Sequence, residues 1–213
     1  DWQDELFRTA GMQDHSLSVS GGNKSTRYSF SGNLFDQKGV IINSGFNRKQ
    51  GRVTLDQTFN DKFKVGVDAR YTSTKTYGTS PGDPDSRNSS MNYLMYSVWG
   101  YRPATYIPNQ DLADNLIDPD VNTNNDYRIN PILSAKNELR EVFNKRVIFN
   151  GFAEYAFTKE LKLKISGGIN SSDWRNDVFN NSQTRYGHPQ SLNKVNGSIL
   201  YTESDTWLNE NLL

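Results

Sequence analysis

Residues 15–35 read HSLSVSGGNKSTRYSFSGNLF and contain two half-apolar strands joined by a turn. Leu17 and Val19 alternate with serines, and after the Gly-Gly-Asn-Lys-Ser break Tyr28 and Phe30 alternate with polar residues. An alternation with a period of two is typical of a strand that has one apolar face. The hairpin therefore needs an apolar environment on one side only, and that environment is either a protein core or lipid.

The same hairpin design recurs twice, and a last strand is expected from about Val195 to the end of the chain. The expected elements are strands 51–59 and 62–72 around the turn Asn60-Asp61, and strands 146–157 and 160–170 around the turn Thr158-Lys159-Glu160. Asn and Asp are typical of tight turns between strands. The sequence thus predicts an all-β, antiparallel chain of about seven strands.

The connections between these strands alternate strictly in length. Short ones are expected at 22–25, 60–61 and 158–160, and long polar ones at 36–50, 73–144 and 172–194. Outer-membrane β-barrels have short turns at one end and long loops at the other. A soluble sandwich has no reason to place every long loop at one end, so the order of the connections favours a transmembrane barrel.

Aromatic residues lie near several expected strand ends, namely Phe59, Phe63, Phe157, Tyr71 and Trp174. They fit the aromatic girdles that flank the lipid-facing band of a barrel. Aromatic residues that close the ends of a sandwich core are the alternative.

The amino-acid composition further limits the class of protein. The chain has 213 residues, 34% of them hydrophobic and 12% aromatic, and no cysteine. No apolar run approaches the roughly 18 residues of a membrane helix, whereas barrel strands are too weakly apolar to show in such a scan. The 24 basic and 24 acidic residues balance, so nothing suggests a nucleic-acid partner. Residues 1–5 are neither basic nor apolar, so no signal peptide is expected there.

One short helix is expected inside the longest loop, near 91–99. Met91, Leu94, Met95 and Val98 recur at helical spacing. Single-chain bacterial barrels have even strand numbers, whereas about seven strands are expected here, and the chain ends mid-pattern in WLNENLL. The sequence is therefore expected to be a fragment of a larger barrel.

Several segments, in order along the chain, carry a family resemblance. They are 1–5 (DWQDE), 15–22 (HSLSVSGG), 35–40 (FDQKGV), 130–139 (NPILSAKNEL), 166–172 (SGGINSS), 179–187 (FNNSQTRYG) and 207–213 (WLNENLL). Together they resemble the SusC/RagA family of TonB-linked (TonB-dependent) outer-membrane transporters, over nearly the whole chain.

The resemblance implies a barrel of about 22 strands with a plugged lumen, which imports large nutrients, typically oligosaccharides and sometimes peptides. It also implies a SusD-like surface lipoprotein that caps the outer face, and the TonB–ExbB–ExbD complex as the energy source. Residues 1–213 would be a partial barrel domain in the cell outer membrane, without the plug, TonB box, signal peptide and remaining strands. On this view the face of Tyr28, Phe30 and Leu34 meets lipid, and the Ser, Arg and Asn face lines the lumen.

No residue pattern indicates an enzyme or a cofactor site. His15 and His188 are the only histidines, and neither a zinc motif nor a phosphate-binding glycine loop is present in the sequence. Between Asp118 and Asp126, oxygen-bearing side chains recur every second residue, as in a calcium loop. Thr123 and Ile129 replace the glycine and glutamate of an EF-hand, so a solvated Asn- and Asp-rich loop is favoured over a metal site.

Aromatic residues of the expected outer loops are the candidates for substrate contact. They are Tyr77, Trp99, Tyr101, Tyr106, Trp174 and Tyr186. Aromatic walls with a few polar groups are typical of ligand sites, and such rings can stack on sugars. Loop packing, or contact with the partner lipoprotein, is the alternative for each. The competing functions are a passive porin-like barrel and a soluble β-sandwich that binds carbohydrate.

Overall fold

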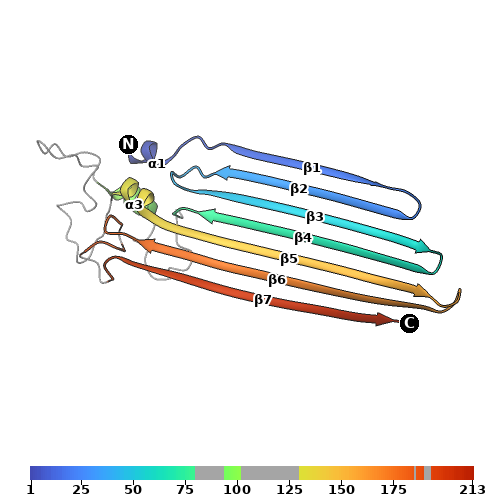
Figure 1. The fold of residues 1–213 in the computed structure, drawn as a ribbon. Coiled ribbons are helices and arrows are strands. Elements are labelled where there is room, and N and C mark those ends of the chain that lie inside the picture. Colours follow the sequence, from blue (N-terminus) through green and yellow to red (C-terminus); the bar gives the residue numbers. More distant parts are fainter. Residues whose placement is uncertain (80–93, 102–129, 185, 190–192) are drawn as a thin grey trace, which may run out of the picture.

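The computed structural model describes residues 1–79, 94–101, 130–184, 186–189 and 193–213. Within these residues a single antiparallel sheet of seven strands follows the order of the sequence from β1 to β7 (Figure 1). The strands are β1 (Met12–Gly22), β2 (Thr26–Lys38), β3 (Gly45–Asn60), β4 (Phe63–Tyr77), β5 (Glu138–Ala156), β6 (Lys162–Asn180) and β7 (Asn196–Leu212). The predicted all-β meander is therefore confirmed.

The strands extend further toward the loop end than the sequence predicts. β2 runs to Lys38 and β3 begins at Gly45, so the predicted long connection 36–50 is wrong and only residues 39–44 link the two strands. Likewise β6 continues to Asn180, well into the predicted loop 172–194. The apolar alternation stops there because charged and polar side chains occupy both faces. The backbones of the strands nevertheless remain paired.

Each of the three short turns is closed by one side-chain oxygen. Oδ1 of Asn23 accepts hydrogen bonds from the backbone N–H groups of Ser25 and Thr26, both at 2.8 Å. Asn60 accepts from Lys62 and Phe63, both at 2.9 Å. Such local bonds are why Asn favours turns.

The second turn differs by one residue from its prediction. Asn60 pairs with Phe63, and the ladder shifts register between Thr58 and Asn60. Asp61 and Lys62 therefore make the turn, instead of Asn60 and Asp61. The irregularity in β3 shifts the turn by one position, and alternation alone does not reveal it.

One face of the sheet is apolar over much of its length. On β4 the apolar residues run from Phe63 to Tyr71, which spans about 26 Å along the strand. The neighbouring strands place apolar side chains beside them, and we call this surface the apolar belt: Leu17, Val19, Tyr28, Phe30, Val53, Leu55, Phe63, Val65, Val67, Ala69, Tyr71, Val147, Phe149, Tyr155, Leu163, Ile165 and Ile169. Leu17 is 74% exposed, so the described chain does not cover the belt.

Aromatic rings gather at the short-turn end of the belt. Phe59 stacks on Phe63 with ring centroids 5.4 Å apart, and Tyr155 meets Phe157 edge-on at 5.0 Å. Phe63 and Tyr155 link the two pairs across β4 and β5 at 6.5 Å. The rings form one continuous aromatic row, as a girdle requires.

Three short helices pack together at the opposite end, where the connections are longer. They are α1 (Trp2–Leu6), α2 (Leu94–Gly100) and α3 (Pro131–Asn137). Their contact is a small core of Leu6, Ile41, Leu94, Val98 and Ala135. The predicted loop helix near 91–99 is thus present as α2, and residues 91–93 lie outside the described part.

No helix in the described part of the chain has the length and apolar character needed to cross a membrane.

Candidate functional site: the polar wall of the sheet

The face opposite the apolar belt is lined by polar and charged side chains, because successive residues of a strand point to opposite faces. We call this surface the polar wall. Its members include Asp14, Ser16, Asn33, Phe35, Arg48, Gln50, Arg52, Asp68, Arg70, Thr72, Arg146, Asn170, Ser172 and Trp174. The belt and the wall together give the sheet one face for an apolar environment and one for water.

A carboxylate bridges two arginines in the middle of the wall. Arg52 lies directly opposite Arg70 in the ladder between β3 and β4. Oδ2 of Asp68 accepts from Nη2 of Arg52 at 2.5 Å, and Oδ1 of Asp68 accepts from Nε of Arg70 at 2.7 Å. Two like charges would repel at this cross-strand position, and the carboxylate between them holds both guanidinium groups in place.

A second polar group lies nearer the loop end. The guanidinium of Arg48 lies over the ring of Phe35, 5.2 Å from its centroid. Arg48 also donates to Oδ1 of Asn33 at 3.4 Å, and Asn33 donates to Oγ of Ser16 at 2.8 Å and to Oδ1 of Asp14. Three strands thus contribute to one array of donors, acceptors and one aromatic ring.

The sequence predicts Asp68 and Arg70 on the polar face, but it indicates neither cluster. Arg52 and Arg48 come from a different strand, and only the cross-strand register brings them beside their partners. The usable signal was the alternation of charged residues in 48–56, in phase with that of 62–72.

The predicted substrate-contact residues do not gather in one place. Trp174 lies on the polar wall, directly opposite Asn144 of β5. Tyr77 lies on the other face, at the end of β4, where the ammonium of Lys75 is 5.7 Å from its ring centroid. The two residues therefore cannot contact the same substrate molecule from one side of the sheet.

The other predicted residues lie among the helices and loops. Tyr101 is buried and meets Trp2 edge-on at 5.3 Å, whereas Trp99 is 70% exposed on α2. The guanidinium of Arg140 lies 5.8 Å from the ring centroid of Tyr186. Tyr106 lies outside the described residues. Substrate contact by these rings stays a prediction.

Metal ligands are not clustered in the part of the chain that the structure describes, where no group of three or more His, Cys, Asp or Glu side chains could hold an ion. The Asp118–Asp126 loop, which has calcium-like spacing, lies outside that part.

Comparison with known proteins gives consistent matches. TonB-dependent receptor P3 of Formosa agariphila is 29% identical over 182 residues, which are 81% of this chain and 17% of the relative. TonB-dependent receptor SusC of Bacteroides thetaiotaomicron is 38% identical over 72 residues, which are 33% of this chain and 7% of the relative. No protein-family model matches the chain.

Solved structures agree with these relatives. The RagAB peptide transporter superposes with a TM-score of 0.63 at 26% sequence identity, covering 88% of this chain and 20% of that one. In sequence and in fold the chain is therefore similar to SusC/RagA-type TonB-dependent receptors. It spans about a fifth of the length of the curated TonB-dependent receptors P3 and P26 that it matches.

Proposed function

We propose that residues 1–213 form part of the wall of an outer-membrane importer for large nutrients, as a partial barrel domain of a TonB-dependent receptor. The observation that carries this proposal is one antiparallel sheet with an apolar belt about 26 Å long on one face and a charged wall on the other. A barrel strand faces lipid on one side and a polar lumen on the other. About 9–11 residues of a tilted strand cross the bilayer, and the apolar stretch of β4 from Phe63 to Tyr71 has a comparable length.

The ends of the sheet support one orientation. Three short turns and the aromatic row lie at one end, and the three helices with the longer connections lie at the other. Barrels of the outer membrane place short turns in the periplasm and long loops outside the cell. The helical end with its small core is therefore the outer face of the proposed transporter.

The relatives support the class of activity. The similar RagAB structure is that of a peptide transporter, and SusC and P3 are TonB-dependent receptors. We infer an oligosaccharide or a peptide as cargo, a SusD-like lipoprotein over the outer face, and TonB–ExbB–ExbD as the source of energy, engaged through a region outside these 213 residues. The protein is proposed to bind and carry its cargo, without catalysis.

Trp174 is the predicted contact residue best placed to meet that cargo. Its ring lies on the polar wall, and it shares a cross-strand row with Phe35 and Arg48. An indole face beside hydrogen-bonding groups suits sugar rings and apolar peptide side chains. Tyr77, Trp99, Tyr101, Tyr106 and Tyr186 remain further candidates of the outer region.

The test is uptake by the source bacterium carrying the full-length receptor. Labelled oligosaccharides and labelled oligopeptides would be offered separately, with and without a protonophore. Trp174→Ala is expected to lower uptake of the carried class. The matched control is Trp207→Ala, because Trp207 lies on the belt side of the sheet, in one row with Phe149 and Ile169.

Receptor abundance in the outer membrane would be measured in parallel, so that lost protein is not counted as lost transport. Uptake that persists in the presence of the protonophore would favour the passive porin-like alternative. A receptor recovered as a soluble protein would contradict the proposal. The soluble-sandwich alternative is not supported, since the described strands form one sheet and not two packed layers.

A further inference from the structure

An apolar hollow of about 480 Å³ lies within the apolar belt. Its floor contains Gly32 and Gly51, which face each other directly across β2 and β3. A Cβ atom at Gly51 would meet nothing within 4 Å, and the nearest atom at Gly32 would be 3.9 Å away. The paired glycines therefore leave a groove between the larger side chains around them, which include Leu17 and Tyr71.

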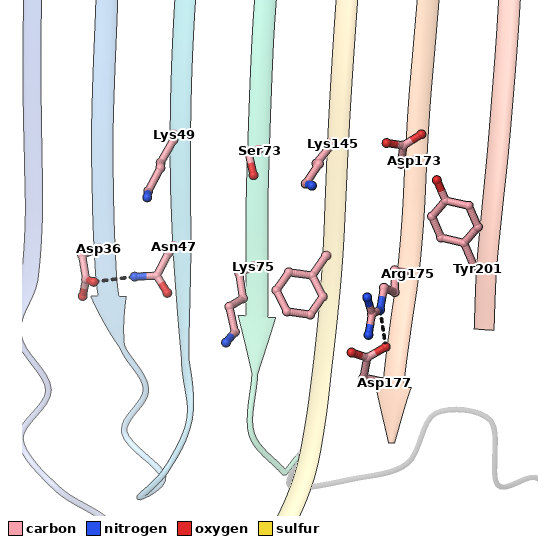
Figure 2. Close-up of a pocket in the computed structure, with 11 residues that line it drawn as sticks. Asp36, Asn47, Lys49, Ser73, Lys75, Lys145, Asp173, Arg175, Asp177 and Tyr201 are labelled. Atoms are coloured by element: carbon pink, nitrogen blue, oxygen red, sulfur yellow. Dashed lines mark hydrogen bonds and ion pairs between the residues drawn. The ribbon is translucent and has the colours of Figure 1, made fainter. Parts of the chain in front are cut away.

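A larger hollow of about 760 Å³ lies on the same face, toward the loop end, and its lining is charged. Figure 2 shows Lys49, Ser73 and Lys145 on three neighbouring strands in this hollow. Lys49 is two residues from Gly51, Ser73 two from Tyr71, and Lys145 two from Val147. Two residues of a strand return to the same face about 7 Å further along, so the charged hollow directly continues the apolar one.

Lys49, Ser73 and Lys145 form a single cross-strand row. The two lysines flank Ser73 from either side, with Cα atoms about 10 Å apart given the usual strand spacing. Both lysine side chains are exposed. Among the described residues, neither has a carboxylate within ion-pair distance, whereas Lys75 is held by Glu141 at 2.8 Å.

The carboxylates of the hollow lie on both sides of the lysines: Asp36 is on β2, next to the strand of Lys49, and Asp173 on β6 lies directly opposite Lys145. Asp173 faces Glu203 across β6 and β7, and Figure 2 shows the Tyr201 hydroxyl directed toward Asp173. Asp177 is already paired with Arg175 at 2.7 Å. Lys49 and Lys145 are therefore the two ammonium groups of the hollow that form no ion pair among the described residues, and they lie directly outward of the glycine groove.

We propose that the two hollows form one site for a phosphorylated lipid of the outer leaflet. One acyl chain lies in the groove over Gly32 and Gly51, and a headgroup phosphate lies between Lys49 and Lys145 with the Ser73 hydroxyl as a further donor. This inference rests on the proposed function, because it requires that the apolar belt faces lipid.

Charge and position together argue for this occupant. A soluble anion would match the lysines but would leave the groove unfilled, and a neutral lipid would fill the groove but leave the lysines unmatched. Ammonium groups are favourable partners for phosphate, and basic residues beside a membrane attract anionic headgroups. An anionic amphiphile is the ligand that meets both requirements at the spacing of about 7 Å that strand geometry gives.

The test uses the full-length receptor in detergent, titrated with bis-phosphorylated lipid A and, separately, with its dephosphorylated form, and read by native mass spectrometry. The variant is Lys49→Gln with Lys145→Gln, which is expected to bind bis-phosphorylated lipid A about 30-fold more weakly. The control is Lys62→Gln with Lys159→Gln, the same loss of charge at the opposite ends of the strands, and its binding should not change. Dephosphorylated lipid A should bind wild type about as weakly as the phosphorylated form binds the double variant.

A second variant tests the groove without removing charge. Gly51→Leu fills open space and is expected to weaken binding about tenfold, while thermal unfolding stays as in wild type. Gly167→Leu is the matched control, because it lies on the same face outside the hollow and its Cβ would make an ordinary contact at 3.6 Å with the Leu208 carbonyl.

The outcomes separate this inference from the proposed function. Equal binding of the two lipid A forms, or of wild type and the lysine variant, would overturn the inference. Displacement of lipid A by millimolar inorganic phosphate would overturn it in favour of a free-anion site. If the receptor fractionates with the outer membrane and still gives one of these results, only the lipid site is overturned and the transporter proposal stands. A receptor found outside the membrane would overturn both the lipid site and the transporter proposal.

Discussion

Val67 lies at the middle of the apolar stretch of β4, four residues from Phe63 and four from Tyr71, or about 13 Å from each end. If the belt faces lipid, Val67→Arg places a cation near the bilayer midplane. A charge there costs about 2–4 kcal/mol in a membrane barrel, and the cost falls to about 0–1 kcal/mol near the interfaces. Val67→Arg should therefore lower the free energy of unfolding by about 3 kcal/mol, and Tyr71→Arg by about 1 kcal/mol or less.

Ser29→Arg is the control at the same depth. Ser29 directly follows Tyr28, which shares a cross-strand row with Val67, and it points to the polar wall. Arginine there would face a polar lumen, so a change within about 0.5 kcal/mol is expected. The assay is guanidinium unfolding of the full-length receptor in phospholipid vesicles. Equal losses for Val67→Arg and Ser29→Arg, or a larger loss for Ser29→Arg, would refute the assignment of the two faces.

Two further predictions concern the turns and the glycines. Asn60→Ala removes both 2.9 Å hydrogen bonds of the turn and should lower the free energy of unfolding by about 1–2 kcal/mol in the same assay. Asp61→Ala is the control and should leave the free energy of unfolding nearly unchanged. An unchanged stability for Asn60→Ala would show that the turn needs no side-chain support. Gly66→Val would place a Cβ atom in steric conflict with the ring of Phe152 and should cost about 1–3 kcal/mol. Gly51→Val, where no atom lies within 4 Å, is its matched control, and equal effects of the two would contradict the packing argument.

Much of the fold could be predicted from residue patterns. The alternation around Leu17, Phe30 and Val67 predicted the strands and their apolar faces, and the order of short and long connections predicted a meander with its loops at one end. The loop-end boundaries could not be predicted, because residues such as Asp36 and Asn47 carry polar side chains on the belt side and still pair through their backbones. The one-residue shift of the turn at Asn60 could not be predicted either, since the residue pattern does not reveal a register irregularity.

The site was less predictable than the fold. The sequence predicts six aromatic contact residues in the outer loops. Trp174 is instead on the polar wall and Tyr77 on the opposite face, because both belong to strands that continue past their predicted ends. The Arg52, Asp68 and Arg70 cluster and the row of Lys49, Ser73 and Lys145 join residues from separate strands. The spacing of these residues in the sequence does not indicate that they are neighbours in the sheet.

The sequence by itself determined that this protein is a β-meander with one apolar and one polar face, because side-chain alternation is a local property with a period of two residues. Only the tertiary structure decided which charges meet across the strands, where the paired glycines Gly32 and Gly51 open a groove, and that the lysine row lies directly outward of it. Cross-strand register sets these neighbours, and register depends on turn geometry and bulges along the whole ladder.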